Sequence, residues 1–357
     1  MQMADIASVV TAVPPYRLTT EQLRDAIAAQ IVCRDGLGVP AGSESEVESR
    51  FCVVPLCQSS ARSSTREADG HRAIVRLAAN AARGALQEAS IGADAVGAVI
   101  SVTTTALDTP SLDVHLVEEL QVRRDCYRIP LAQMGCPGGI AGLRLATDLL
   151  PSLGGRSVLV VCAEAPSLHL PAGEWSRDDY QATFTYGDAA AAVVVSASSA
   201  SPVEIELVKS FLLASPVGPS SARVTRSGLR SMAGSSFVHR SIRQHLRSAV
   251  VQSLAAAELS LRDISSWAIP PRSRPMLREI MTSLELSESQ VADSVRVWRN
   301  CGNTISAGVF LCFAELLATG RPFDSRTGLL SVGAGGACEL AVIRMRGDFR
   351  SFRATGC

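Results

Sequence analysis

The sequence has little of the charge that would direct the protein to a polyanion. It contains one lysine, Lys209, among its 34 basic residues, and 34 acidic residues bring the formal net charge to zero. A chain without excess positive charge has no general attraction for nucleic acid or for an anionic membrane surface. We therefore expect neither a nucleic acid nor a membrane as a partner.

Membrane and metal signals are also missing. No run of about 18 uncharged apolar residues occurs, so no membrane-spanning helix is expected, and the first residues do not form a secretory signal. The sequence has five histidines and ten cysteines but no CxxC pair, which argues against a metal site. Most cysteines lie in apolar runs, which favours reduced cysteines in a cytoplasmic protein.

What is present is an alternation of short apolar runs with longer amphipathic stretches. Strands are predicted at 6–13, 96–102, 157–164, 189–197, 203–210, 265–270, 328–333 and 338–345. Helices are predicted at 20–32, 72–89, 139–150, 240–259 and 305–320. The segments 34–70 and 214–236 are predicted to be surface loops. This alternation indicates an α/β layered fold.

A serine-rich stretch at 196–202 divides the chain into residues 1–200 and residues 201–357. Each part has a similar rhythm of strands and helices, and each carries a glycine-bearing strand-to-helix turn. The turn is MGCPGG in the first part and NCGNTIS in the second. We interpret the two parts as related halves, although no sequence repeat is visible.

The turn of the first part places a cysteine at the start of a helix. Proline is favoured just inside a helix start, so Pro137 puts Cys136 at the predicted N-cap. The positive end of the helix dipole stabilises a thiolate and lowers the pKa of the thiol. Such a cysteine can accept an acyl group. The alternative is a buried cysteine in a tight turn.

Five motifs show a resemblance to a known family. They are VTTTALDTP, GCPGGIAGLRLATDLL, GRSVLVVCAE, YGDAAAAVVV and WRNCGNTISAG. With this spacing the chain resembles the type III polyketide synthases (chalcone synthase-like enzymes) of the thiolase superfamily. The resemblance implies a thiolase-like fold, five-layered αβαβα from two related halves, and a cytoplasmic homodimer. It implies coenzyme A thioesters as substrates and no cofactor.

The resemblance also implies a reaction. In similar enzymes a cysteine takes an acyl group from an acyl-CoA, and a histidine and an asparagine hold the thioester oxygen of malonyl-CoA while it loses carbon dioxide. The enolate then attacks the acyl-cysteine. Cys136 matches the cysteine, and Asn303 in CGNTISAG matches the asparagine. The alternative for Asn303 is a turn or helix N-cap residue.

The family histidine is replaced. Its motif follows a W-x-A strand, where this sequence reads WAIPPRSRP, so Pro270 occupies its position. Counted from Cys136, His169 falls where relatives carry a pocket-lining threonine close to the cysteine. An imidazole there can pair with a thiolate or donate to a thioester oxygen. His169 is therefore predicted as the third catalytic group, and the alternative is a loop histidine that shapes the pocket.

Three further residues are predicted to bind substrate. Arg50 in ESRFCVV resembles the arginine that contacts the coenzyme A phosphates, and the alternative is a lone surface arginine. Thr104 matches a pocket residue, and the alternative is a strand-end cap. Ile305 occupies a position that is usually small and polar in the family.

Three functions remain open from the sequence. The first is a condensing enzyme that takes an acyl-CoA starter and then malonyl-CoA. The second is an acyltransferase that uses the same cysteine without decarboxylation, which the loss of the histidine favours. The third is a catalytically quiet partner subunit of an active homologue, and the retention of Cys136 at a helix start argues against it.

Overall fold

The computed structural model describes residues 4–32, 46–55, 64–169, 177–197, 201–213, 222–225, 228–231, 235–320 and 324–346. The strands are β1 Ala4–Ala12, β2 Tyr16–Thr19, β3 Ser49–Cys52, β4 Val96–Thr103, β5 Tyr127–Ala132, β6 Ser157–Glu164, β7 Ala189–Ser196, β8 Val203–Leu212, β9 Ala222–Thr225, β10 Gly228–Ser231, β11 Ser266–Ala268, β12 Ser325–Val332 and β13 Ala337–Met345. The helices are α1 Thr20–Val32, α2 Ser64–Glu88, α3 Leu112–Glu119, α4 Gly138–Leu149, α5 Arg177–Thr183, α6 Ser235–Ser241, α7 Arg247–Ala255, α8 Arg274–Leu284, α9 Ala292–Cys301 and α10 Gly308–Ala318.

Within these described residues, nine strands form one mixed sheet in the order β11-β12-β13-β8-β1-β7-β6-β4-β5. Strand β4 is parallel to β5 and β6, and β11 is parallel to β12, whereas the other neighbours are antiparallel. Strands β4, β6 and β7 are buried along their whole length. Strands covered on both faces tolerate continuous apolar runs, which explains why these segments show no alternation of polar and apolar residues.

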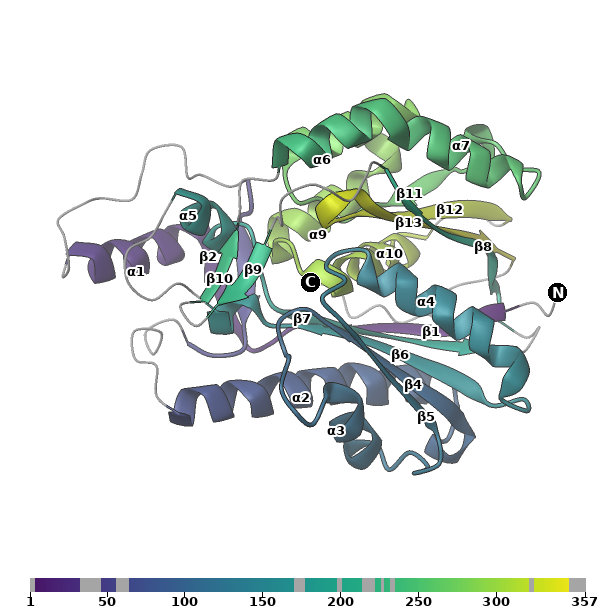
Figure 1. Ribbon diagram of the computed structural model, residues 1–357, viewed down its shortest axis with the longest axis horizontal. Helices are drawn as coiled ribbons and strands as arrows, with labels where there is room; N and C mark the ends of the chain where they lie inside the picture. The colour runs from purple at the N-terminus through teal and green to yellow at the C-terminus, as the bar shows by residue number, and fades with distance from the viewer. Residues whose placement is uncertain are drawn as a thin grey trace.

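The helices cover the sheet in three layers (Figure 1). Helices α2 and α3 cover the outer face of the half that contains β4 to β7, and α6 and α7 cover the outer face of the half that contains β8 and β11 to β13. Helices α4 and α10 lie between the two halves of the sheet. The resulting order is helix, strand, helix, strand, helix, as the resemblance predicts.

Three hydrophobic clusters correspond to the contacts between these layers. The central cluster joins α4 and α10 to both halves of the sheet and includes Ile140, Leu143, Phe310 and Phe313. One outer cluster packs α2 and α3 on the first half, and the other packs α7 and α8 on the second half around Trp267. Each helix layer therefore buries one apolar stripe against a sheet face, which is the condition for a layered fold.

The predicted strands and helices all form, with ends displaced by a few residues. The sequence prediction missed β2, β5, α3, α5, α8 and α9. Much of the predicted loops 34–70 and 214–236 lies outside the described residues, but the described parts contain strand β3 and the β9–β10 hairpin. The predicted division at residue 200 falls between β7 and β8 and stays a prediction.

Two expectations from the sequence, that no helix spans a membrane and that the cysteines are reduced, can be compared with the structure. No described helix is both long and apolar enough to cross a membrane. Among the described residues, six cysteines are free, namely Cys52, Cys126, Cys136, Cys162, Cys312 and Cys338. Cys301 is disulfide-bonded, so the expectation of reduced cysteines is wrong for this residue.

A buried aspartate ties three segments of the first half together. The Asp188 carboxylate, just before β7, accepts hydrogen bonds from the backbone N–H of Val53 (2.8 Å), the backbone N–H of Ser167 (2.9 Å) and the Ser167 hydroxyl. Burial raises the pKa of Asp188 to about 6. Its partners follow β3 and β6, so one side chain fixes the ends of both strands against β7.

We predict that Asp188→Ala lowers the free energy of unfolding by about 3 kcal/mol or more, because it leaves buried donors without an acceptor. Urea denaturation followed by circular dichroism measures the change. Asp148→Ala is the control: Asp148 is exposed and paired only with Arg144, so the change should stay within about 0.5 kcal/mol. Equal losses in both variants would contradict the role given to Asp188.

Candidate active site

The turn before α4 presents Cys136. Gly135 has a positive φ of 65°, and the backbone N–H of Gly138 donates to the Gly135 carbonyl at 3.0 Å. Helix α4 begins at Gly138 with Pro137 as its N-cap. The predicted N-cap is therefore wrong by one residue, although the thiol still lies at the N-terminal end of the helix. Cys136 as a whole residue is half-buried, and its thiol lies on the buried side.

This turn packs closely on the segment before α10. A Cβ built on Gly139 would lie 2.6 Å from the Ser306 carbonyl oxygen and 3.2 Å from the ring of Phe310. No side chain fits at that distance, so glycine is required for the two segments to meet. The approach brings the start of α4 beside the turn that carries Asn303.

Asn303 is held in a fixed orientation next to the thiol. Its backbone N–H donates to the Thr185 carbonyl at 2.8 Å, and its side-chain Oδ1 accepts from the backbone N–H of Ile305 at 2.9 Å. The thiol of Cys136 also donates to Oδ1, with Sγ at 3.7 Å. These contacts fix Oδ1 as the acceptor and leave Nδ2, which is buried and has no partner among the described residues, as an unused donor.

A buried glutamate connects the segments of the site through hydrogen bonds. Glu164, at the end of β6, accepts from the backbone N–H of Thr104 (3.0 Å), the Thr105 hydroxyl (2.7 Å) and the Ser306 hydroxyl (2.5 Å). Its hydrogen bonds favour the charged form, but burial is the larger effect and raises the pKa of Glu164 to about 7. The sequence prediction missed this residue, although a glutamate that ends an apolar strand was a visible signal.

The electrostatic setting of Cys136 differs from the prediction. Burial raises the pKa of the thiol above its ordinary value, and the negative charge of Glu164 adds to this effect. The positive charge of Arg272 and the hydrogen bond with Asn303 act in the opposite direction but do not outweigh burial. The expected net lowering of the pKa by the helix dipole is therefore wrong, because the loss of water around the thiol has the stronger effect.

His169 lies beside this network. It ends a short 3₁₀ turn after β6, and its Nε2 is 2.6 Å from the Thr105 carbonyl oxygen, so Nε2 carries the proton and donates. No interaction between His169 and Cys136 is found in the described part of the chain. The structure connects the two residues only through the segment around Thr105, and a catalytic role for His169 stays a prediction.

Thr104 and Ile305 flank the cysteine and the asparagine. The Thr104 hydroxyl accepts from the backbone N–H of Gly135 at 3.1 Å, so it fixes the cysteine turn. Ile305 is buried and has a φ of 51°, a region that β-branched residues rarely adopt, which indicates local strain beside Asn303. A substrate contact by either residue stays a prediction.

Arg50 is buried and does not reach the surface. The residue is 2% exposed, and its guanidinium donates to the Thr183 carbonyl (2.6 Å) and the Thr20 hydroxyl (2.9 Å) above the ring of Phe184. Burial lowers the pKa of Arg50 to about 10. A surface arginine is therefore excluded, and in this conformation the guanidinium offers no exposed face to a phosphate.

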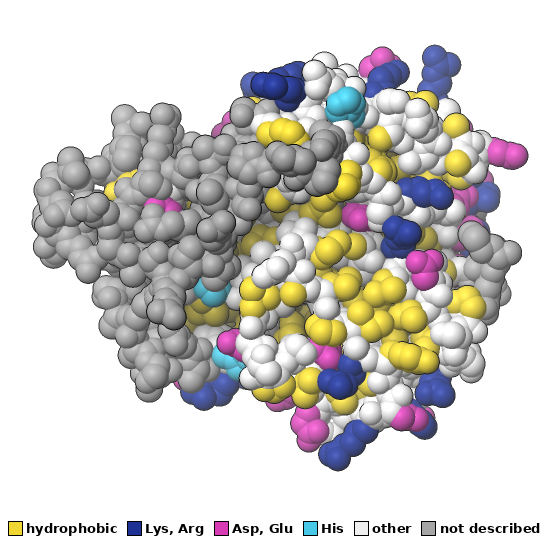
Figure 2. Space-filling view, viewed as in Figure 1, with side chains coloured by type: hydrophobic (Ala, Val, Ile, Leu, Met, Phe, Trp, Pro, Cys, Tyr) yellow, Lys and Arg dark blue, Asp and Glu magenta, His cyan; other side chains and the backbone are white. Residues whose placement is uncertain are grey.

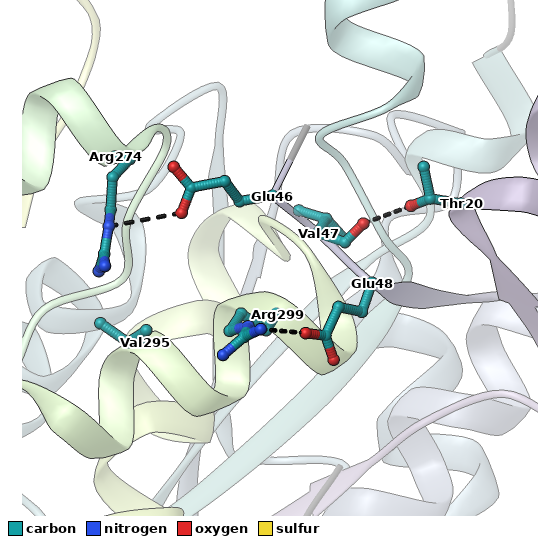
Figure 3. Close-up of a pocket in the computed structure, with 7 residues that line it drawn as sticks. All are labelled: Thr20, Glu46, Val47, Glu48, Arg274, Val295 and Arg299. Atoms are coloured by element: carbon teal, nitrogen blue, oxygen red, sulfur yellow. Dashed lines mark hydrogen bonds and ion pairs between the residues drawn. The ribbon is translucent and has the colours of Figure 1, made fainter. Parts of the chain in front are cut away.

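A charged cleft of about 490 Å³ adjoins Arg50 through Thr20 (Figure 3). Arg274 points at Glu46, 3.4 Å away, and Arg299 forms an ion pair with Glu48. Both arginines of this cleft already have a carboxylate partner. An anion such as a phosphate would have to compete with these glutamates for them.

The segment around Pro270, where the sequence resemblance predicts the histidine position, packs on the start of α10. Pro270 is buried, and Arg272 follows it two residues later. Tyr186 pairs through its backbone with Asn303, and burial raises the pKa of its phenol. The sequence prediction missed Tyr186 and Arg272. No group of three or more His, Cys, Asp or Glu residues that could hold a metal is present among the described residues.

Comparisons with known proteins agree with this arrangement. The family of chalcone and stilbene synthases, N-terminal domain, matches residues 55–199, and that of 3-oxoacyl-[acyl-carrier-protein] synthase III, C-terminal, matches residues 254–345. The 1,3,6,8-tetrahydroxynaphthalene synthase of Streptomyces peucetius subsp. caesius is 27% identical over 95% of this chain and 92% of its own. The 3,5-dihydroxyphenylacetyl-CoA synthase of Streptomyces toyocaensis is 25% identical over 84% of this chain and 80% of its own.

A solved structure shows the same fold. The crystal structure of PKS-I from the brown alga Ectocarpus siliculosus superposes with a TM-score of 0.83, at 22% identity, and covers 97% of this chain and 99% of that chain. This likeness confirms the predicted mixed α/β, thiolase-like fold. The two family matches lie on either side of residue 200.

We predict that Glu164→Gln speeds alkylation of Cys136 above pH 7 by a factor on the order of threefold, because it removes a negative charge that disfavours the thiolate. Below pH 7 Glu164 is itself increasingly protonated, so the rates of wild type and variant should converge. Iodoacetamide labelling, quantified on the Cys136 peptide by mass spectrometry, gives the rates.

Glu339→Gln is the matched control for that substitution. Glu339 is another buried glutamate with a serine partner, Ser210, on neighbouring strands of the other half of the sheet. Its substitution should leave the labelling of Cys136 unchanged. A Glu164→Gln rate equal to that of wild type at pH 8 and above would refute the electrostatic link.

Proposed function

We propose that the chain is a condensing enzyme of the type III polyketide synthase kind, within the thiolase superfamily, and that it carries an acyl group on Cys136. The observation that supports this most strongly is the pair formed by Cys136 and Asn303. The thiol Sγ lies 3.7 Å from Oδ1, while Nδ2 of the same amide is a buried donor without a partner among the described residues. A buried unused donor beside a nucleophile is suited to a substrate oxygen.

The first step is acylation of the thiol. The Cys136 thiolate attacks the thioester carbon of an acyl-CoA, the C–S bond to coenzyme A breaks, and coenzyme A leaves as a thiol with the proton that Cys136 gave up. The raised pKa of Cys136, caused mainly by burial, means that the free thiol is mostly protonated at neutral pH. Loss of that proton therefore has to accompany substrate binding.

The second step is carbon–carbon bond formation, with malonyl-CoA as the proposed extender. Decarboxylation leaves an enolate whose charge lies on the thioester oxygen, and Nδ2 of Asn303 is the donor proposed for that oxygen. The enolate carbon then attacks the acyl carbon, the C–S bond to Cys136 breaks, and Cys136 leaves as a thiolate. Pro270 has no donor to add, since proline lacks both an N–H and a polar side chain. His169 is the proposed replacement, but its Nε2 proton is directed at the Thr105 carbonyl and would have to be redirected.

Pro270 also supports a second candidate function. Acyl transfer from Cys136 to an oxygen, nitrogen or carbon nucleophile needs an oxyanion donor but no decarboxylation. A site with one donor in place of two is expected to lose about 10²–10³ in the rate of a step that depends on both. A non-decarboxylating acyltransferase is therefore the alternative that this substitution favours.

We further propose a homodimer that associates through the face carrying β5. Strand β5 is the end strand of the sheet, and Tyr127 on it is 55% exposed. Met134, just after the strand, is also exposed. Figure 2 shows hydrophobic side chains gathered on the face where α4 and β5 lie in Figure 1. An apolar edge of this kind favours association with a second surface.

We predict that the protein gains the mass of one acyl group when it is incubated with a suitable acyl-CoA from a panel of starters. Intact-mass spectrometry followed by peptide mapping should locate the group on Cys136. Cys136→Ala should gain no mass, whereas Cys126→Ala, which removes another free cysteine, should be acylated like the wild type.

Release of labelled carbon dioxide from radiolabelled malonyl-CoA, measured in the same samples, distinguishes the candidate functions. For the condensing enzyme, carbon dioxide is released, and Asn303→Ala lowers the release by about 10²–10³-fold while Cys136 is still acylated. An adduct without carbon dioxide release supports the acyltransferase. No adduct with any donor supports a quiet partner subunit. If His169→Ala changes neither acylation nor product formation, His169 has no catalytic role.

For the proposed dimer, Tyr127→Asp is predicted to shift the molar mass in light scattering from that of two chains to that of one, because it buries a charge in an apolar contact. Tyr16→Asp is the control, since Tyr16 is also exposed but lies on β2, away from the β5 edge. A wild-type protein with the molar mass of one chain would contradict the dimer.

A further inference from the structure

Two histidines from different helices meet on the outer side of the sheet half that contains β4 to β7. His71 belongs to α2 and His115 to α3, and these two helices lie side by side (Figure 1). The Nε2 atoms of the two rings are 3.3 Å apart. The ring centroids are 4.9 Å apart, and the ring planes are inclined by 69°. Both residues are half-buried, so the pair is partly open to solvent.

A carboxylate determines which nitrogen of His71 is turned toward His115. Asp108, in the loop before α3, places Oδ2 at 2.8 Å from Nδ1 of His71. In the neutral ring Nδ1 therefore carries the proton and donates it to the carboxylate, and Nε2 presents its lone pair toward His115. Metal-ligating histidines in proteins are held in this way, with one ring nitrogen donating to a carboxylate and the other binding the ion.

The distance between the two rings favours a shared ion over a simple hydrogen bond. Hydrogen bonds from an N–H group normally span about 2.7–3.2 Å between heavy atoms. The separation of 3.3 Å between the Nε2 atoms is longer than that range. Zinc binds imidazole nitrogens at about 2.0–2.1 Å with tetrahedral angles, so two ligating nitrogens lie about 3.3 Å apart. The two Nε2 atoms therefore already have the separation of two ligands on one ion.

We propose that His71 and His115 form a binding site for a divalent transition-metal ion of the Zn²⁺, Ni²⁺ and Cu²⁺ class, with Asp108 orienting His71. Imidazole suits these ions, whereas Ca²⁺ and Mg²⁺ prefer oxygen ligands. Two side chains would bind the ion, which agrees with the absence of a group of three ligating residues from the described part of the chain. Water molecules would complete the coordination.

Binding of the ion would displace one proton and join three segments. Both Nε2 atoms must be unprotonated to bind, so the proton between the rings is released or moves to Nδ1 of His115. The ion would then link α2, α3 and the loop that carries Asp108. The same loop begins with Thr104 and Thr105, which donate hydrogen bonds to Glu164. An ion that binds only the folded protein stabilises it, so the metal should make these segments harder to unfold.

The test titrates the metal-free, full-length protein with Zn²⁺ at neutral pH in a calorimeter. We expect one equivalent of Zn²⁺ that His71→Asn and His115→Asn each remove. Asp108→Ala should weaken the binding of this equivalent by about tenfold or more, because it removes the group that orients His71. Zn²⁺ should raise the melting temperature of the wild type more than that of either histidine variant. Metal binding here does not depend on the function proposed for Cys136.

His239→Asn is the matched control. His239 also has a carboxylate partner, Glu279, 2.7 Å from its Nδ1, but its ring contacts no second imidazole among the described residues. Its substitution should leave the Zn²⁺ titration as it is in the wild type. If His71→Asn and His115→Asn bind Zn²⁺ like the wild type, or if His239→Asn loses the same equivalent, the proposal is wrong.

A second measurement uses the unmodified protein, in case a substitution at either histidine prevents folding. Diethyl pyrocarbonate modifies unprotonated imidazole nitrogens, and a bound metal ion blocks them. Zn²⁺ should slow the modification of His71 and His115 but not that of His239, as quantified on the separate peptides by mass spectrometry, and a chelator should restore the rates. Equal rates with and without Zn²⁺, or equal protection of all three histidines, would mean adventitious binding only and would overturn the proposal.

Discussion

The buried carboxylate of Glu164 holds together the segments that form the site. It accepts hydrogen bonds from the turn after β4 and from the segment before α10, while it stands itself at the end of β6. The turn after β4 in turn fixes the cysteine turn through Thr104 and Gly135. This acid is therefore a polar anchor between the two halves of the site, in addition to the hydrogen bonds of Asn303 with Cys136 and Thr185.

The same carboxylate raises the pKa of the candidate nucleophile, Cys136. Its charge opposes a thiolate at Cys136, and burial opposes it more strongly. Arg272 and Asn303 act the other way, so the charge state of the thiol is set by a balance between groups from four segments. With the pKa of Glu164 itself at about 7, this balance changes within the neutral pH range. Binding of an acyl-CoA that excludes water or supplies donors would change it again.

Much of this arrangement could be predicted from local sequence. Buried strands such as β6 and β7 are continuous apolar runs, and α4 shows helical periodicity after Pro137, so their residues define them without tertiary information. Strand β5 was missed because it is an exposed edge strand that contains a proline, Pro130, and so lacks the pattern of a buried strand. The meeting of Cys136 with Asn303 could be expected because each lies in a short motif with a glycine turn, and their catalytic roles stay predictions.

The remainder depends on contacts between residues far apart in the chain. Glu164 and Ser306 are 142 residues apart, and no local pattern predicts that they meet. The sequence suggested a lowered pKa for Cys136 because the start of a helix can be predicted from local residues. The burial of the thiol, which has the larger effect on its pKa, cannot be predicted from them. Arg50 was predicted to contact the coenzyme A phosphates, with a surface arginine as the alternative, because charge is visible in the sequence whereas its burial beside Phe184 and Thr183 is not.

The predicted replacement of a histidine by Pro270 would have a physical consequence for the chemistry. A protonated histidine can both stabilise an anion through its charge and donate a proton from the same ring. Here the ring of Pro270 fills the space beside Gly308, and the nearby charge belongs to Arg272, which does not exchange protons. A site built in this way can stabilise a thiolate, an oxyanion or an enolate. A proton would move through water, through the substrate, through the imidazole of His169 or through an acid of intermediate pKa such as Glu164, so proton transfer would not use the residue at position 270.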